Sequence, residues 1–327
     1  MADRLDDQGL ATVFGGSGFV GRYAVAALAK QGWRIRAAVR RPDLAGFLQT
    51  AGFVGQVAPV QANVRYPQSV ERALVGAKVA VNCTGVLTSG GKQTFKALHV
   101  DGPRAMAKAA RAAGVRHFVH ISAIGADPNS TSAYARSKAE GEAAVLEEFP
   151  GAIIIRPSIV FGPEDQFFNR FASMARMSPV LPLIGGGRTR FQPVFVGDIA
   201  TAITTCAAGG GTPGVIYEAG GPEVLTFREL LDLTQEWAGR DRGYLPLPFW
   251  LAKLQAFLTW PLPDSLRPIT VDQVRMLQHD NVVSAAAKAE GRTLEALGVP
   301  TPQGVAAIVP RYLERFRPRG QFASYRT

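Results

Sequence analysis

The sequence predicts an α/β fold, a doubly wound parallel sheet with a smaller second domain interleaved with it. Short apolar runs typical of buried strands alternate with segments of helical spacing over the first 160 residues. Regular alternation of this kind indicates βαβ units. The chain is also long and apolar enough to bury a large core, because 47% of its 327 residues are hydrophobic and only 19% are charged.

The expected elements follow in chain order. Strands are predicted in "LATVFG" from residue 10, in "RIRAAVR" from residue 34, and at 57–64, 79–85, 117–123 and 152–162. Helical spacing separates them at 19–31 and in the runs "SVERALVG", "GPRAMAKAARAAG" and "SKAEGEAAVLEEF". Beyond residue 162 the pattern loosens, and a strand "VFV", a helix from Asp198 and a strand at 214–221 then resume it.

The balance of charge and the cysteine count narrow the class of protein. A formal net charge of +10 favours anionic ligands, anionic lipid or acidic protein surfaces. Nucleic acid is not expected, because the sequence has no helix-turn-helix, zinc-finger or aromatic RNA-binding signature. The two cysteines, Cys83 and Cys206, do not form a disulfide framework and indicate a reducing compartment. The start "MADRLDDQGL" is typical of neither a secretory signal nor a transit peptide.

Three glycines lie between the first strand and the first helix, in "ATVFGGSGFVGRY". Gly15 is expected to permit a tight turn, Gly18 to let backbone approach a pyrophosphate, and Gly21 to allow close helix–strand packing. The amino end of the helix then offers N–H donors and a positive dipole to phosphates. The pattern predicts a dinucleotide-binding turn of the Rossmann type, with a purely structural βα turn as the alternative.

The end of the second strand indicates which dinucleotide binds. NAD-binding proteins place an acidic residue there for the ribose hydroxyls, whereas this chain has Arg40 and Arg41 in "AAVRRPD". Paired guanidinium groups suit a 2′-phosphate by charge and by fork geometry, so we expect NADPH rather than NADH. The alternative is two arginines on a solvated loop. Asp43 lies further on and is expected to cap a helix.

The candidate catalytic residues are Ser122, Tyr134 and Lys138, in "HISAIGADPNSTSAYARSK". On a helix, Tyr134 and Lys138 share one face, because they are four residues apart, and both could reach a bound nicotinamide. A nearby cation favours the phenolate form of a tyrosine, and a positioned proton donor speeds carbonyl reduction. His117 and His120 lie three apart in a strand and so point to opposite faces, and no metal site is expected.

Together with the Gly-x-x-Gly-x-x-Gly spacing, these residues resemble the extended branch of the short-chain dehydrogenase/reductase superfamily. The resemblance implies that Tyr134 is a general acid, that Lys138 lowers its pKa and holds the ribose, and that Ser122 orients a carbonyl. One position departs from the pattern. His99, in "LHVDGP", stands where many extended members have an asparagine that supports a proton relay.

The same resemblance completes the expected cofactor site. Asn63 matches the position after the third strand that lies near the adenine, and "NCTG" at 82–85 matches the segment that passes under the cofactor. The expected cofactor-binding residues are Gly15, Ser17, Gly18, Phe19, Val20, Gly21, Arg40, Arg41, Asn63, Val64, Thr84, Gly85, Tyr134, Lys138 and Pro157.

Longer stretches narrow the resemblance further. The runs "YARSKAEGEAAVLEEFPGAIIIRPSIVFGPEDQFFNRFASMARM" and "FQPVFVGDIA" are similar to the NADPH-binding accessory subunits of respiratory complex I, alpha subcomplex subunit nine. The similarity covers about residues 10–220. It implies a structural, non-reacting NADPH and, as partners, other complex I subunits at the quinone-reactive junction. It also implies a peripheral place on the cytoplasmic face of a bacterial inner membrane, or on the matrix side in a mitochondrion.

The chain is expected to divide into two domains. Residues 1–162 would form the dinucleotide-binding domain, with 190–221 returning to it, and 163–189 with 222–327 the smaller domain. The segment 244–263 is nearly all apolar, with Lys253 its only charge, and is too short to span a bilayer. It could lie against a membrane or another subunit, or form a core helix. The tail carries Arg311, Arg315, Arg317, Arg319 and Arg326, solvated or in contact with anionic lipid or acidic subunits.

Two main functions therefore stay open at this point. The first is an NADPH-holding accessory subunit of complex I that does not turn the nucleotide over. The second is an active NADP-dependent reductase, dehydrogenase or sugar-nucleotide epimerase that uses Ser122, Tyr134 and Lys138. A third, a sensor that reports the redox state of NADPH to a partner, has less support.

Overall fold

The computed structural model describes residues 8–259 and 269–318, and the chain divides into two compact units. Unit 1 comprises Met1–Pro157, Val196–Ala219 and Ser284–Thr301, and unit 2 comprises Ser158–Phe195, Gly220–Val283 and Pro302–Thr327. The third segment of unit 1 was expected in the smaller domain. It packs on unit 1 because Arg292 Nη1 donates to Ile216 O at 2.8 Å and Glu218 N donates to Arg292 O at 3.0 Å.

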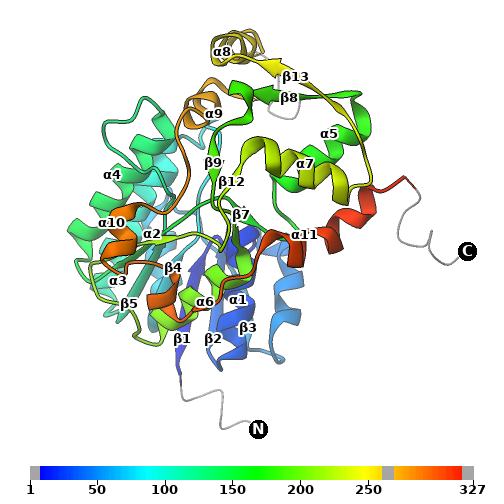
Figure 1. The fold of residues 1–327 in the computed structure, drawn as a ribbon. Coiled ribbons are helices and arrows are strands. Elements are labelled where there is room, and N and C mark those ends of the chain that lie inside the picture. The colour runs from blue at the N-terminus through cyan, green and yellow to red at the C-terminus, as the bar shows by residue number, and fades with distance from the viewer. Residues whose placement is uncertain (1–7, 260–268, 319–327) are drawn as a thin grey trace, which may run out of the picture. The chain divides into compact units, whose positions relative to one another are not determined.

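Unit 1 is built on a seven-stranded parallel sheet with strand order β11-β6-β5-β4-β1-β2-β3 (Figure 1). The strands are β1 (Leu10–Phe14), β2 (Arg34–Val39), β3 (Val57–Gln61), β4 (Ala77–Asn82), β5 (His117–Ile121), β6 (Ile153–Pro157) and β11 (Ile216–Ala219). The strand order reverses between β1 and β4, which makes the sheet doubly wound. The predicted fold class is confirmed.

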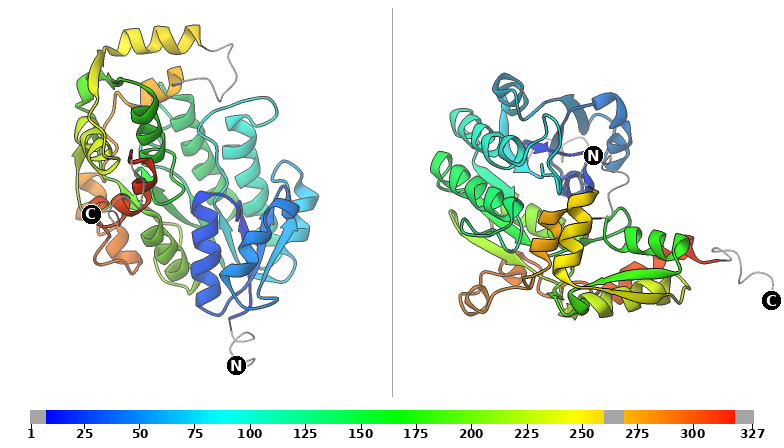
Figure 2. Two further views of the ribbon diagram at one scale, coloured as in Figure 1. Left: turned by 90° about the vertical axis from the view of Figure 1, so that its right-hand side faces the viewer. Right: turned by 90° about the horizontal axis from the view of Figure 1, so that it is seen from above.

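Helices cover both faces of this sheet (Figure 2). On one side α1 (Phe19–Lys30) packs against α6 (Val196–Ala207), and on the other α2 (Pro67–Leu74), α3 (Gly102–Ala112) and α4 (Ala133–Glu148) pack in a row. Phe14 of β1, Ala80 of β4 and Phe118 of β5 lie in one core cluster with side chains of α2, α3 and α4. The short α10 (Ala285–Ala289) completes the helices of this unit.

The expected strand at 152–162 is two strands. β6 ends at Pro157, whose carbonyl still accepts from Ile124 N at 2.9 Å, and the chain then leaves the large sheet. β7 (Val160–Phe161) pairs instead with β10 (Val194–Phe195), in a separate two-stranded sheet of unit 2. The hydrophobic pattern runs through this break because both halves are buried, so it could not reveal the change of partner.

Unit 2 has a core of its own. Its other strand pairs are β8 (Val180–Ile184) with β13 (Gly243–Leu247) and β9 (Arg190–Phe191) with β12 (Leu225–Thr226). Its helices are α5 (Phe168–Met177), α7 (Phe227–Trp237), α8 (Phe249–Leu258), α9 (Val271–Met276) and α11 (Val305–Leu313). Aromatic side chains dominate the core, with Phe161, Phe168, Phe191, Phe227 and Trp237 all buried. Buried Asp165 accepts from the hydroxyl of Tyr312 and so ties α11 to the loop before α5.

The apolar segment predicted at 244–263 forms β13 and α8, and its last four residues lie outside the described residues. Helix α8 buries only Ala252 and Ala256, whereas Trp250, Phe257 and Leu258 are each about two-thirds exposed, at 68%, 66% and 67%. The alternative of a core helix is therefore wrong for α8. Across the described part of the chain, no helix combines the length and apolarity needed to cross a membrane.

The basic tail is only partly described, because Arg319 and Arg326 lie outside the described residues. Arg315 Nη2 donates to Asn169 Oδ1 at 2.5 Å, and Arg317 Nε donates to Trp237 O at 3.0 Å. These two side chains are thus hydrogen-bonded within unit 2, whereas Arg311 is exposed.

Candidate functional site

The residues predicted to bind a dinucleotide lie at one edge of the sheet in unit 1. Most of them follow or end a strand, and the carboxyl ends of parallel strands meet at one edge. Gly15 follows β1, Arg40 follows β2, Asn63 and Val64 follow β3, Thr84 and Gly85 follow β4, Ser122 follows β5, and Pro157 ends β6. Ser17 lies in the glycine turn, and Phe19 and Val20 begin α1.

The glycine turn leaves the amino end of α1 open to an anion. Gly15 has a φ of 75°, and its N–H donates to Ala38 O at 3.0 Å, while Gly18 N donates to Gly15 O at 2.9 Å. Helix α1 begins at Phe19 with Gly18 as its N-cap, a residue that has no side chain to accept from the first-turn N–H groups. The first turn reads "FVGR" and carries no carboxylate. These are the donors that a pyrophosphate would take.

Gly21 is the tightest point of this turn. A Cβ added there would lie 2.1 Å from Gly15 O, so α1 starts in direct backbone contact with the turn below it. The close packing expected at Gly21 is therefore observed. The role of Gly18 toward a pyrophosphate stays a prediction.

Two exposed arginines follow β2, as expected. Arg40 is exposed, and Arg41 Nη2 lies 2.7 Å from Asp43 Oδ2. The predicted N-cap role of Asp43 is wrong, because Asp43 lies inside the 3₁₀ turn Pro42–Leu44 and Arg41 is the cap residue. The hydrogen bond from Arg41 instead lowers the pKa of the Asp43 carboxyl. Exposed ion pairs of this kind are weak, so a phosphate can compete for the Arg41 guanidinium.

A third arginine, Arg22, lies beside the turn and was not predicted. Arg22 Nη2 donates to Ser17 O at 3.2 Å, and its guanidinium carbon lies 4.9 Å from the centre of the Phe47 ring. The signal was present in the sequence, since Arg22 directly follows the third glycine of the motif.

The loops after β3 and β4 are held by side-chain amides. Asn63 Oδ1 accepts from Arg65 N at 3.2 Å, and its predicted contact with adenine stays a prediction. Asn82 Oδ1 accepts from Thr84 N at 2.9 Å and from Thr84 Oγ1 at 2.5 Å. Thr84 therefore starts a loop whose path is set by a buried residue at the end of β4.

Tyr134 and Lys138 lie on α4 one turn apart, as the spacing predicted. The helix starts there because Ser132 caps it, its hydroxyl accepting from Ala135 N at 3.2 Å. Lys138 is 4% exposed, and its Nζ donates to Ile121 O at 2.9 Å. Burial lowers the pKa of Lys138 to about 8, although the nearby Glu142 and Cys83 act to raise it.

Ser122 is turned into the protein interior. Its hydroxyl donates to Glu142 Oε1, and Arg156 holds the same carboxylate through Nε at 2.9 Å and Nη2 at 2.6 Å. A serine has one proton to donate. While Ser122 donates this proton to Glu142 it cannot also donate to a substrate carbonyl, and its orienting role stays a prediction.

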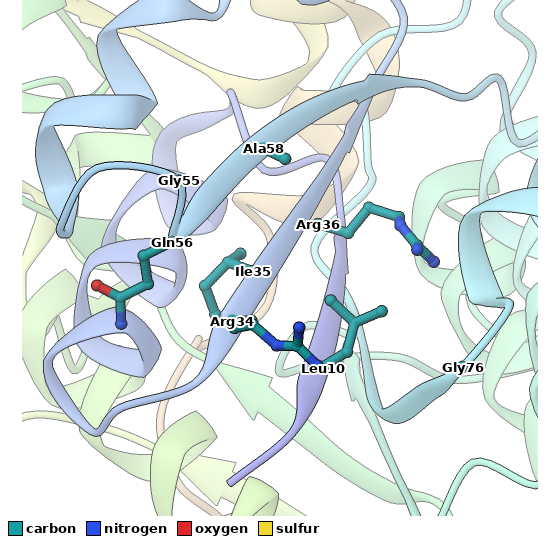
Figure 3. Close-up of a pocket in the computed structure, with 8 residues that line it drawn as sticks. All are labelled: Leu10, Arg34, Ile35, Arg36, Gly55, Gln56, Ala58 and Gly76. Atoms are coloured by element: carbon teal, nitrogen blue, oxygen red, sulfur yellow. The ribbon is translucent and has the colours of Figure 1, made fainter. Parts of the chain in front are cut away.

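A hollow of about 370 Å³ opens at the other edge of the sheet, at the amino ends of β1, β2 and β3 (Figure 3). Two arginines line it. Arg36 extends toward Gly76, and its Nη1 donates to Ala73 O at 2.7 Å and Val75 O at 2.9 Å. Its guanidinium thus caps the end of α2. The hollow lies at the opposite edge of the sheet from the residues predicted to bind the dinucleotide. Within the described residues no group of His, Cys, Asp or Glu could hold a metal ion.

Comparison with known proteins agrees with this geometry. A model of the NAD dependent epimerase/dehydratase family matches residues 11–220. The chain is 35% identical over 286 residues to "NADH dehydrogenase [ubiquinone] 1 alpha subcomplex subunit 9, mitochondrial" of Arabidopsis thaliana, which covers 84% of this chain and 71% of that protein. It is 36% identical over 198 residues to the ceramide reductase of Caulobacter vibrioides, 61% of each chain.

A solved structure shows the same fold. The NADPH-dependent quinone oxidoreductase of Escherichia coli, solved with NADPH, superposes with a TM-score of 0.71 over 93% of this chain and 99% of that one, at 21% identity.

The fold and the edge of the sheet define a nicotinamide-dinucleotide-binding protein of the Rossmann class. The chain belongs to the NAD dependent epimerase/dehydratase family and, within it, to the family of the complex I alpha subcomplex subunit 9 proteins. The resemblance inferred from the sequence is confirmed.

Replacing Gly21 by alanine should remove bound nucleotide and destabilise unit 1. The added Cβ would lie 2.1 Å from Gly15 O, so α1 must move off the turn, and overpacking of this kind costs about 1–3 kcal/mol. Urea unfolding and the nucleotide content of the purified protein measure both effects. Gly46→Ala is the control, because a Cβ there meets nothing within 4 Å. Wild-type nucleotide content in Gly21→Ala would contradict the assigned geometry.

The protein should lose stability as the pH falls from about 6.5 toward 5. Burial and the charge of Lys138 lower the pKa of His99 to about 3, and burial lowers that of His120 far below its usual value. The unfolded chain therefore binds more protons than the native one below about pH 6.5, at about 1.4 kcal/mol per pH unit for each proton. Urea unfolding at several pH values measures the slope. It should be shallower in His99→Gln, and His279→Asn, which alters an exposed histidine, is the control.

Proposed function

We propose that this chain is an accessory subunit of respiratory complex I that holds NADPH without turning it over. The support for the partner is the identity to a protein named as a subunit of NADH dehydrogenase, over most of the length of both chains. Residues implied in nucleotide binding, the glycine turn and the Tyr134–Lys138 face, are all present at the carboxyl edge of the sheet.

The hydrogen bond from Ser122 to Glu142 supports the second statement of the proposal, that NADPH is not turned over. Reduction of a carbonyl needs donors that polarise its oxygen, and the hydroxyl of Ser122, which is expected to orient that carbonyl beside Tyr134, is bonded to Glu142. Freeing it would leave Glu142, which is 3% exposed, with one bond fewer inside the protein. A nucleotide bound to the native state adds stability by mass action whether or not it reacts.

The preference for NADPH rests on charge. The residues after β2 are Arg40 and Arg41 rather than an acid, and Arg22 donates to Ser17 O in the glycine turn. The Asp43 carboxylate, which by itself would repel a 2′-phosphate, is paired with Arg41. A 2′-phosphate would supply a dianion for guanidinium groups in this region to bind.

We place the protein peripherally on the membrane, on the cytoplasmic face in a bacterium or the matrix side in a mitochondrion, near the quinone-reactive junction. Helix α8 supports this placement, because Trp250, Leu254, Phe257 and Leu258 expose apolar surface and Lys253 is the one charge among its residues. Such a face suits the apolar surface of a membrane-bound partner or the interfacial region of a lipid bilayer.

Native-gel separation of membranes, followed by mass spectrometry, tests the accessory function. The tagged chain should migrate with the NADH:quinone oxidoreductase and release NADPH, not NADH, when it is denatured. Leu254→Lys should weaken this association by adding a charge to the apolar face, and Lys288→Ala on α10 is a control on unit 1. Recovery as a soluble, partner-free species, or release of no nucleotide, would count against the proposal.

A second candidate function is an NADPH-dependent reductase for a lipid carbonyl. The observation that favours it is the 36% identity to a protein named ceramide reductase. Here NADPH would deliver a hydride to the carbonyl carbon, and Tyr134 would give its proton to the oxygen while Lys138 supports the phenolate.

Tyr134→Phe separates the two functions. If the chain is a reductase, this change should lower turnover of NADPH with a ceramide-type ketone by at least about 100-fold, the usual size of general acid catalysis, and leave nucleotide bound. In the accessory function neither the wild type nor the variant oxidises NADPH. Tyr66→Phe, at an exposed tyrosine, is the control. Absorbance at 340 nm follows the reaction.

A further inference from the structure

Both ring nitrogens of His99 are used, although this residue stands where many relatives are expected to have an asparagine. It lies in a π-helical turn, η4 (Lys96–Asp101), and is 2% exposed. Nε2 lies 3.1 Å from Val86 N, and Nδ1 lies 2.9 Å from Ser137 Oγ. Ser137 Oγ in turn donates to Tyr134 O at 2.7 Å. Such π-helical insertions are frequent at functional sites.

The direction of each hydrogen bond from Val86 through His99 and Ser137 to Tyr134 O can be assigned. A backbone N–H can only donate, so Nε2 of His99 accepts from Val86. A neutral imidazole carries one proton, which must then lie on Nδ1 and be donated to Ser137 Oγ, while the Ser137 proton goes to Tyr134 O. The arrangement requires a neutral ring, and burial with the charge of Lys138 lowers the pKa of His99 to about 3.

The ring also packs against the tyrosine whose helix it braces. The Phe95 ring stacks on His99 with centroids 5.3 Å apart, and the Tyr134 ring meets it edge-on at 5.4 Å. Backbone contact adds to this, since a Cβ at Gly141 of α4 would lie 1.8 Å from His99 O. His99 therefore touches three parts of the site at once: the loop after β4, helix α4, and the Tyr134 side chain.

A second histidine braces the same loop from the sheet, in the opposite tautomer. Asn82 Oδ1 accepts from Thr84 N, so its Nδ2 faces His120 Nδ1 at 2.9 Å and donates to it. The proton of His120 then lies on Nε2, a buried atom that has no partner within residues 8–259 and 269–318. The loop Thr84–Val86 is thus fixed at its start by Asn82 and at its end by His99.

We propose that His99 is a positioning residue of the nucleotide site, which holds the loop Thr84–Val86 and the Tyr134 ring in fixed relation. The proposal rests on the proposed function, because that loop and Tyr134 are the predicted neighbours of the nicotinamide ribose. The consequence for chemistry is that His99 cannot serve as a relay to water as an asparagine would, because both its nitrogens are occupied by protein groups.

Nucleotide retention in four variants tests this role. Gln can reach the Nε2 position and keep the bond to Val86, whereas Asn reaches only the Nδ1 position and keeps the bond to Ser137. Each lost bond to His99 should speed NADPH dissociation about fivefold. His99→Gln, His99→Asn and Ser137→Ala should therefore each be about fivefold faster, and His99→Ala about 25-fold faster. His279→Asn is the control. Dissociation is followed by the loss of NADPH fluorescence in excess NADP.

A merely structural role would lower the stability of the nucleotide-free protein in these variants without changing the dissociation rate. Unchanged rates across the set would therefore overturn the proposal. Nitrogen-15 NMR of the histidine rings gives a second readout. His99 should show Nδ1–H and His120 Nε2–H in the nucleotide-free protein, and the reverse tautomer at His99 would also overturn it. If the wild type binds no NADPH, the proposed function fails. The tautomer measurement then still decides whether His99 links Val86 N to Ser137 Oγ as proposed.

Discussion

The arrangement of the predicted nucleotide-binding residues in unit 1 depends on one contact, the approach of Gly21 to the carbonyl of Gly15. A side chain at position 21 would occupy the space of that oxygen, so only glycine lets α1 begin directly over the end of β1. The contact brings the first-turn N–H groups to the point where the strand order reverses, between β1 and β4. That is where open α/β sheets bind ligands, because loops from neighbouring strands diverge there.

Around this edge the interior is polar, and its hydrogen bonds limit what the site can do. Glu142 and Arg156 form an ion pair with side-chain exposures of 4% and 22%, and such a pair persists only where its remaining hydrogen bonds are satisfied. Ser122 supplies one of them. The same residue cannot meet the need of a buried carboxylate and that of a reacting carbonyl, which favours a protein that retains a nucleotide over one that consumes it.

Much of the fold could be predicted because local sequence patterns, apolar runs and a glycine motif, indicate its strands and first turn. The strands of the large sheet are apolar runs of the right length, and the Gly15 to Gly21 motif marks the turn between the first strand and helix. The break after Pro157, the parallel pairing of β8 with β13, and the place of 284–301 in unit 1 depend on contacts between residues far apart in the chain. Hydrophobic periodicity carries no information about such partners.

The sequence by itself determined which chemical groups gather at the carboxyl edge. The glycines, Arg40 and Arg41, Asn63 and Thr84 each follow a predictable strand, and Tyr134 and Lys138 share one face of a predictable helix. Only the tertiary structure decided how those groups are used. It turned Ser122 inward to Glu142 and occupied both nitrogens of His99. The physical reason is that a hydrogen bond is settled by distance and direction in space, and residues up to 38 positions apart, such as His99 and Ser137, must fold together before either exists.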